Sequence, residues 1–345
     1  MGEHAVVYGR PALVAAVDPR ARVEVDEAAA GIAVELIDFG RCLETTWQEA
    51  RERATVARRA WERYVADPTP ENFAAIDARS PEALTQVALG ELANVLENRP
   101  LPPLRLRVSS GLPVGSGFGS SAAIAVALIG GVLTRLEGRA DPELVDALAL
   151  EVERRQHGLP SGVDHKTVLF GGVIQATRRL DGELQIARLE RRSPRLETLA
   201  VYQTGEPAET TGEVVAEVRR RRDENPGEVD ALLDRMGVAV EVFRDELESA
   251  GEPTSRFVDQ IVEYQRCLEE LGVVPRPVRE TIRRVEACGG AAKISGAGAL
   301  TGASAGCLLV HWPEGPPAVL PPRLDEYSRQ AVALGAQGLR VEEDR

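Results

Sequence analysis

The chain has 345 residues, of which 43% are apolar and 28% are charged. This length favours two domains rather than one, and the composition is typical of an ordinary globular protein. A net charge of −13 argues against a nucleic-acid partner, because a phosphate backbone needs a clustered basic face. We expect no membrane partner and no secretion, since neither a long apolar run nor a signal peptide is evident. The four cysteines lie far apart without metal-ligand spacing, which indicates reduced thiols in the cytoplasm rather than disulfides or zinc.

Short β-branched runs and long helical patterns alternate through the first half of the chain. Apolar alternation predicts strands, and apolar residues that recur every three to four positions predict helices. Asp141 stands where a helix N-cap is expected, ahead of Pro142, and Gly158 is a stop signal for the same helix. The predicted strands are residues 5–8, 21–26 and 104–108, and the predicted helices are residues 44–66, 81–97, 120–136 and 141–156.

The second half of the chain begins with a predicted β-hairpin over residues 167–189, which turns at Asp181-Gly182. Beyond residue 193 the pattern changes to one strand, Leu199–Gln203, and then to four helical patterns that reach Cys288. We therefore place a domain boundary at this change. One domain is expected over residues 1–193 and the other over residues 194–345.

A glycine-serine loop lies between a predicted strand and a predicted helix. Its glycines let the backbone approach a ligand, while the N–H groups and the positive dipole end of the helix attract an anion. The loop matches neither the Walker pattern nor the dinucleotide-binding pattern. A helix entry with Ser120 as N-cap and no ligand is the structural alternative. The candidate phosphate-binding residues are Pro113, Gly115, Ser116, Gly117, Gly119, Ser120, Ser121 and Ala122.

Two carboxylates flank a Gly-Leu-Pro turn later in the chain. Glu153 is near the end of a predicted helix and Asp164 follows the turn, so the two could meet in one cleft. Such a pair can divide the work of phosphoryl transfer, one acid binding Mg²⁺ and the other orienting or deprotonating a hydroxyl. The alternative is that Asp164 only caps a turn. His157 and His165 are weaker candidates, because a solitary histidine is more often structural.

Two further segments place polar side chains in apolar or glycine-rich sequence. Glu3 and His4 precede an apolar run, for which the plain alternative is a solvated terminus. The segment Lys293–Gly298 is rich in small residues, which let the backbone approach a substrate or another strand. Only Lys166 and Lys293 of the 41 basic residues are lysines, which indicates two positions where arginine does not substitute.

Four segments, in this order, resemble the superfamily of galactokinases, homoserine kinases, mevalonate kinases and phosphomevalonate kinases (GHMP kinases). The first is most similar to the corresponding block of mevalonate kinases. The resemblance implies an α+β fold of two domains, an S5-like N-terminal half and a ferredoxin-like C-terminal half, with the substrate between them. It implies transfer of a phosphoryl group from ATP to the primary hydroxyl of mevalonate, with Mg²⁺ as cofactor. The four segments are Gly2–Gly9, Pro113–Ala123, Pro160–Asp164 and Lys293–Gly298.

The same resemblance implies roles for individual residues. The loop Gly115–Ser121 would hold ATP, Ser121 and Glu153 would coordinate Mg²⁺, and Asp164 would lie beside the substrate's hydroxyl. A homodimer is the default oligomer. Glu3, His4 and Thr211 match positions at the mevalonate pocket. Lys293, Gly296 and Gly298 match the family pattern in the last of the four segments.

Two departures from the family pattern keep other functions open. The family carries a lysine shortly before the Gly-Glu-His block, whereas this chain starts at Met1, so we expect a truncated first strand, with Lys166 as a candidate replacement for the lysine. After Gly298 the family's short glycine run is extended by residues 299–304. The alternatives are a kinase of phosphomevalonate or of a sugar, and an ATP-binding protein of the same fold without transfer activity.

Overall fold

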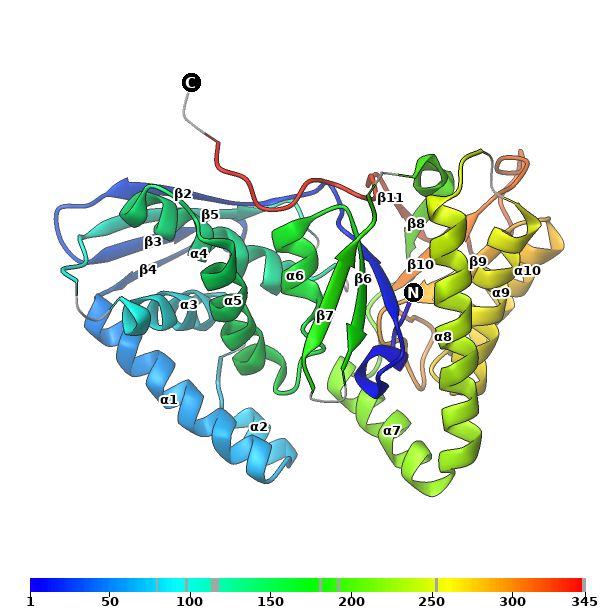
Figure 1. The fold of residues 1–345 in the computed structure, drawn as a ribbon, viewed down its shortest axis with the longest axis horizontal. Coiled ribbons are helices and arrows are strands. Elements are labelled where there is room, and N and C mark those ends of the chain that lie inside the picture. Colours follow the sequence, from blue (N-terminus) through cyan, green and yellow to red (C-terminus); the bar gives the residue numbers. More distant parts are fainter. Residues whose placement is uncertain are drawn as a thin grey trace. The chain divides into compact units, whose positions relative to one another are not determined.

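The chain forms two compact units in a computed structural model that describes residues 1–78, 80–96, 99–112, 118–179, 182–190, 193–251 and 254–342. Among the described residues, unit 1 contains 1–18, 118 and 172–336, and unit 2 contains 19–112, 119–171 and 337–342. The units are discontinuous in sequence because strand β1 (Ala12–Ala15) pairs antiparallel with β6 (Val173–Arg178), which joins the start of the chain to its second half (Figure 1). The division into one domain over residues 1–193 and another over residues 194–345 remains a prediction.

Unit 2 is built on a four-stranded sheet in the order β2-β5-β3-β4. Strand β3 runs parallel to β5, and the other neighbours are antiparallel. Alternate residues of β3 and β5 are buried, so one face of the sheet contacts the helices, as period-two patterning requires. The elements are β2 (Ala21–Glu27), β3 (Ile32–Leu36), η2 (Ile37–Phe39), β4 (Arg41–Thr45), α1 (Trp47–Ala66), α2 (Pro70–Ala74), α3 (Pro81–Val95), β5 (Leu104–Ser110), α4 (Ser120–Glu137), α5 (Pro142–His157) and α6 (Val163–Phe170).

Three of the long helices of unit 2 begin where the sequence supplies a capping side chain. Thr46, Ser80 and Asp141 accept hydrogen bonds from the first-turn N–H groups of α1, α3 and α5. Among the described helices, α4 alone is long and apolar enough to cross a bilayer by length and composition. Its apolar residues contribute to the core of unit 2, together with α1, α3, α5 and the sheet, and this burial accounts for its composition.

Unit 1 contains two antiparallel sheets, β1-β6-β7 and β11-β8-β10-β9. Helix α9 packs beside α8 and against β9, and α10 also contacts β9 (Figure 1). The four helical patterns expected before Cys288 are confirmed as α7 to α10, and all four cysteines are free. The further elements are η1 (Ala5–Tyr8), β7 (Leu184–Arg188), η3 (Pro194–Thr198), β8 (Leu199–Gln203), α7 (Thr211–Glu224), α8 (Pro226–Glu248), α9 (Ser255–Glu270), α10 (Arg276–Ala287), β9 (Ala291–Ser295), β10 (Cys307–His311) and β11 (Ser328–Gln330).

Two local predictions are wrong. Residues 5–8 form the 3-10 turn η1 rather than a strand, because neighbouring Ala5 and Val6 are both buried and Gly9 ends the segment in a left-handed conformation. Residues 167–170 belong to helix α6, so the hairpin is confined to β6 and β7. One residue of its expected turn, Asp181, lies outside the described residues.

Candidate functional site

The described part of the glycine-serine loop ends at the N-terminus of α4. Gly119 is the N-cap in a left-handed conformation, φ 66°, and no side chain caps the helix. Ser120, Ser121 and Ala122 therefore form the first turn, whose N–H groups lack partners within the helix and favour an anion. The structural alternative that made Ser120 the N-cap is wrong. Of the phosphate-binding candidates, Pro113, Gly115, Ser116 and Gly117 lie outside the described residues.

Packing of α4 against α5 brings Ser121 to Glu153, its expected partner. Ser121 Oγ donates a hydrogen bond of 3.0 Å to Glu153 Oε1 and lies 3.2 Å from His157 Nε2. The Glu153 side chain is only 1% exposed, whereas the His157 side chain is 48% exposed. His157 is thus part of the cluster, because its position one helical turn after Glu153 places it on the same face of α5.

Asp164 lies in the first turn of α6 and is exposed. A Cβ added at Gly119 would lie 3.7 Å from the Asp164 Cβ, so the entry to α4 passes directly beside this acid. Burial raises the pKa of Glu153, the charge of Asp164 raises it further, and the result is about 8 despite the hydrogen bond from Ser121. The two carboxylates that the sequence pairs are therefore electrostatically coupled within unit 2.

Ser121, Glu153 and Asp164 supply one hydroxyl and two carboxylates, which are the hard oxygen donors that Mg²⁺ prefers. A divalent cation would relieve the repulsion that raises the Glu153 pKa. Within the described ranges, no group of three or more His, Cys, Asp or Glu side chains could hold a metal ion by itself. Mg²⁺ in phosphoryl-transfer sites commonly uses one or two carboxylates together with phosphate oxygens and water, so this donor set fits it.

We expect the metal-free protein to lose stability as the pH rises from 4.5 towards 8. The folded chain holds a proton on Glu153 in this range that the unfolded chain has lost, so the free energy of unfolding falls with pH. Thermal unfolding in EDTA should show this slope in the wild type and a smaller slope in Glu153→Gln. Equal slopes in the two proteins would contradict the raised pKa.

A second polar cluster forms inside unit 1 around Glu3. Glu3 Oε1 accepts hydrogen bonds from Lys293 Nζ at 2.8 Å and from Ser295 Oγ at 3.3 Å. Among the described residues, the buried Oε2 atom has no hydrogen-bond partner. Burial alone would raise the Glu3 pKa, but the adjacent Lys293 ammonium and the α-amino group lower it to about 2. Glu3 is therefore an ionised carboxylate in a partly buried position, with 12% of its side chain exposed, rather than part of a solvated terminus.

His4 is held in a left-handed conformation, φ 63°, that non-glycine residues seldom adopt. Its Nε2 lies 2.9 Å from the carbonyl oxygen of Ala297, so Nε2 carries the hydrogen and Nδ1 is left as an acceptor. Burial lowers the pKa of His4, which favours the neutral imidazole.

The glycines on either side of Ala297 differ in the space around them. A Cβ on Gly296 would meet open space, whereas one on Gly298 would lie 2.1 Å from the Val273 carbonyl oxygen.

Other candidates lie apart from these clusters. Thr211 is exposed at the first position of α7, after the N-cap Thr210, and no described contact joins it to Glu3 or His4. Lys166 Nζ lies 2.5 Å from Asp146 Oδ2, so its ammonium is paired with an acid other than Asp164. His165 is fully buried 3.2 Å from the same aspartate, which fits a structural role.

Sequence reasoning did not identify Tyr264 or Ser295. The Tyr264 hydroxyl accepts a hydrogen bond from Gly2 N at 2.8 Å and donates one to Glu3 O at 2.9 Å. Tyr264 is part of the apolar face of α9, so its pattern in the sequence is that of an ordinary core residue. Ser295 lies inside the Lys293–Gly298 motif, and its position there is the only signal that could have found it.

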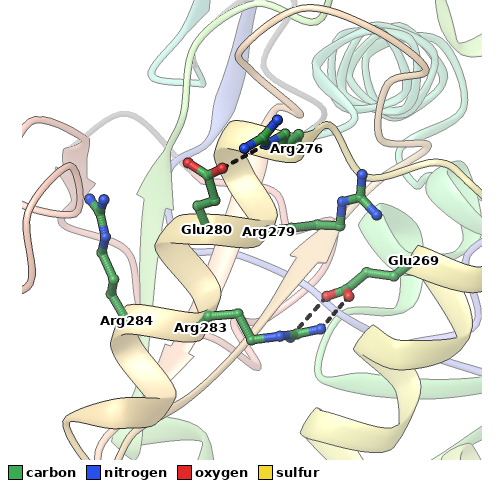
Figure 2. Close-up of a pocket in the computed structure, with 6 residues that line it drawn as sticks. All are labelled: Glu269, Arg276, Arg279, Glu280, Arg283 and Arg284. Carbon is green, nitrogen blue, oxygen red and sulfur yellow. Dashed lines mark hydrogen bonds and ion pairs between the residues drawn. The ribbon is translucent and has the colours of Figure 1, made fainter.

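An open pocket on α9 and α10 contains none of the predicted site residues (Figure 2). Two of its arginines are paired with its acids, Arg276 with Glu280 and Arg283 with Glu269. Figure 2 shows Arg279 and Arg284 directed to different sides of the helix rather than towards a common point. The pocket is lined by Glu269, Arg276, Arg279, Glu280, Arg283 and Arg284.

Known proteins resemble this chain over nearly its full length. Residues 84–172 match the GHMP kinases N terminal domain. A mevalonate kinase from Thermococcus gammatolerans is 29% identical over 354 residues, covering 99% of this chain and 95% of the relative. The Methanococcus jannaschii mevalonate kinase structure has a TM-score of 0.68 at 19% identity, covering 90% of this chain and 86% of its own. The structure of L. major mevalonate kinase in complex with R-mevalonate has a TM-score of 0.62 at 20% identity. That match covers 90% of this chain and 83% of the L. major chain. The expected α+β kinase fold is confirmed.

Proposed function

Because this chain belongs to the GHMP kinase superfamily, we propose that it transfers the γ-phosphoryl group of ATP to the primary hydroxyl of mevalonate, giving 5-phosphomevalonate and ADP. The observation that carries the proposal is the 29% identity to a mevalonate kinase over 99% of the chain. The coupled carboxylates beside the α4 N-terminus support the same reaction class, because phosphoryl transfer depends on positioning and on charge stabilisation.

Unit 2 supplies groups for ATP and for the reacting hydroxyl. The N–H groups of the first turn of α4 would bind phosphate oxygens, together with the glycine-serine loop. Ser121 and Glu153 would hold Mg²⁺, which when bound offsets the negative charge of the phosphates. Asp164 is exposed and would accept the proton of the primary hydroxyl or orient that hydroxyl for attack. Phosphoryl transfer requires donors for the phosphates, oxygen ligands for the cation and an acceptor for the hydroxyl proton, and unit 2 has a group of each kind.

Unit 1 supplies groups that recognise a hydroxylated acid. Neutral His4 would accept a hydrogen bond from a substrate hydroxyl through Nδ1, because its hydrogen is on Nε2 and is donated to Ala297. Ionised Glu3 would accept a hydrogen bond from a hydroxyl. Thr211 is proposed as a substrate contact from the resemblance alone. We further infer a cytoplasmic enzyme whose partners are ATP and mevalonate, with a homodimer as the default assembly.

The proposed function is tested by coupled measurement of ADP release with Mg-ATP and mevalonate. We expect mevalonate-dependent turnover that disappears in EDTA and returns with added Mg²⁺. A panel with phosphomevalonate and galactose in place of mevalonate separates the substrates. Turnover on galactose or phosphomevalonate without turnover on mevalonate would overturn the substrate assignment, and ATP binding without turnover on any of them would overturn the enzymatic one.

A further inference from the structure

Lys293 on β9 has one of the most enclosed cationic groups of unit 1, with 1% of its side chain exposed. Its ammonium lies 2.8 Å from Glu3 Oε1 and 2.5 Å from the carbonyl oxygen of Ile294, and 5.2 Å from the centre of the Tyr264 ring. All three contacts favour a positive charge. A buried ammonium without such partners would carry a large desolvation penalty.

The same network fixes the chain turn that carries His4. The Tyr264 hydroxyl bridges the Gly2 N–H and the Glu3 carbonyl oxygen, and the Glu3 side chain is bonded to Lys293 and Ser295. His4 itself adopts a left-handed conformation and bonds Ala297, two residues after Ser295. A non-glycine residue with positive φ is strained and persists only where its surroundings determine it. Here α9 and β9 supply those surroundings.

We propose that Lys293 is a positioning residue that acts through Glu3, holding Glu3 and His4 in the arrangement that receives the hydroxylated substrate. This inference rests on the proposed function, which it deepens by assigning the charge partner of the pocket. Lys293 and Ser295 occupy Oε1 of Glu3, and among the described residues Oε2 has no donor. These contacts hold the Glu3 carboxylate in one orientation, with its second oxygen enclosed and without a donor among the described residues.

A double-mutant cycle tests the proposal in the full chain. The variants are Lys293→Met, Glu3→Gln and the two combined, with kcat and the separate KM values for mevalonate and ATP measured for each. We expect Lys293→Met to raise KM for mevalonate at least tenfold and to change KM for ATP less than twofold. In the Glu3→Gln background the same substitution should change KM for mevalonate less than twofold, because its route of action is already lost.

A matched control separates positioning from general loss of stability. Arg195 forms a buried ion pair with Glu246 in the same unit, 2.6 Å from Nη1 to Oε2, and no described contact joins it to Glu3. Arg195→Met should lower the thermal midpoint while leaving both KM values unchanged. If Lys293→Met does not fold, the combined variant still reports coupling, since removing both charges should restore folding.

The outcomes distinguish this inference from the proposed function. An inactive wild type on mevalonate contradicts the proposed function itself. An active wild type in which the Lys293 and Glu3 effects on KM multiply, or in which Lys293→Met raises both KM values equally, overturns the positioning role alone. A tenfold effect that is absent in the Glu3→Gln background supports it.

Discussion

Asp164→Asn is expected to lower kcat by about 10²–10⁴-fold, the usual contribution of a positioned acid or base. The amide keeps the size of the carboxylate but removes its charge and its ability to accept a proton. Asp164 is exposed and makes no described hydrogen bond, so folding should be unaffected. The measurement is steady-state ADP release with saturating Mg-ATP and mevalonate, together with the thermal midpoint of both proteins.

Asp26 offers a matched control, because it is an exposed aspartate on β2 in the same unit and has no predicted role. Asp26→Asn makes the same chemical change and should leave kcat within twofold of the wild type. A kcat of Asp164→Asn that equals that of Asp26→Asn would remove Asp164 from the catalytic step. A selective rise in KM for mevalonate with unchanged kcat would instead assign it to binding.

Gly298→Ala is expected to be the most destabilising substitution of the glycine-rich motif. Gly298 has φ 76°, and an added Cβ would lie 2.1 Å from the Val273 carbonyl oxygen. That oxygen also accepts a hydrogen bond of 3.0 Å from Ala299 N, so the backbone cannot move away without losing a bond. Backbone strain and overpacking together should lower the free energy of unfolding by about 2–4 kcal/mol.

Gly315→Ala separates steric overlap from backbone strain. Gly315 has φ 82°, close to that of Gly298, but an added Cβ would meet no atom within 4 Å. Gly315→Ala should therefore lower the free energy of unfolding only by the contribution of backbone strain, about 1 kcal/mol. Urea unfolding of the two variants at one temperature gives both values. Equal losses of unfolding free energy would show that the backbone near Val273 moves away from the added Cβ at little cost.

Much of the fold was predictable because local sequence signals agree with tertiary packing. Asp141 and Gly158 bound α5 as expected, and apolar alternation located β2 and β5. The 3-10 turn at residues 5–8 was not predictable, since its β-branched run favours a strand and only burial of Ala5 and Val6 decides otherwise. Helix α6 was missed because its apolar residues match a buried strand as well as a short helix.

The sequence by itself determined the chemical types of the candidate site: a glycine-serine helix entry, an acid on either side of a turn, and a glycine-rich motif led by one of two lysines. These signals depend on neighbouring residues in the chain, so they can be recognised in the sequence alone. Only the tertiary structure decided which groups meet. Ser121 reaches Glu153 across 32 residues because α4 packs on α5, and Lys293 reaches Glu3 across 290 residues because α9 and β9 enclose the chain's first turn. Burial in those contacts then sets the charges, raising the pKa of Glu153 while Lys293 keeps Glu3 ionised.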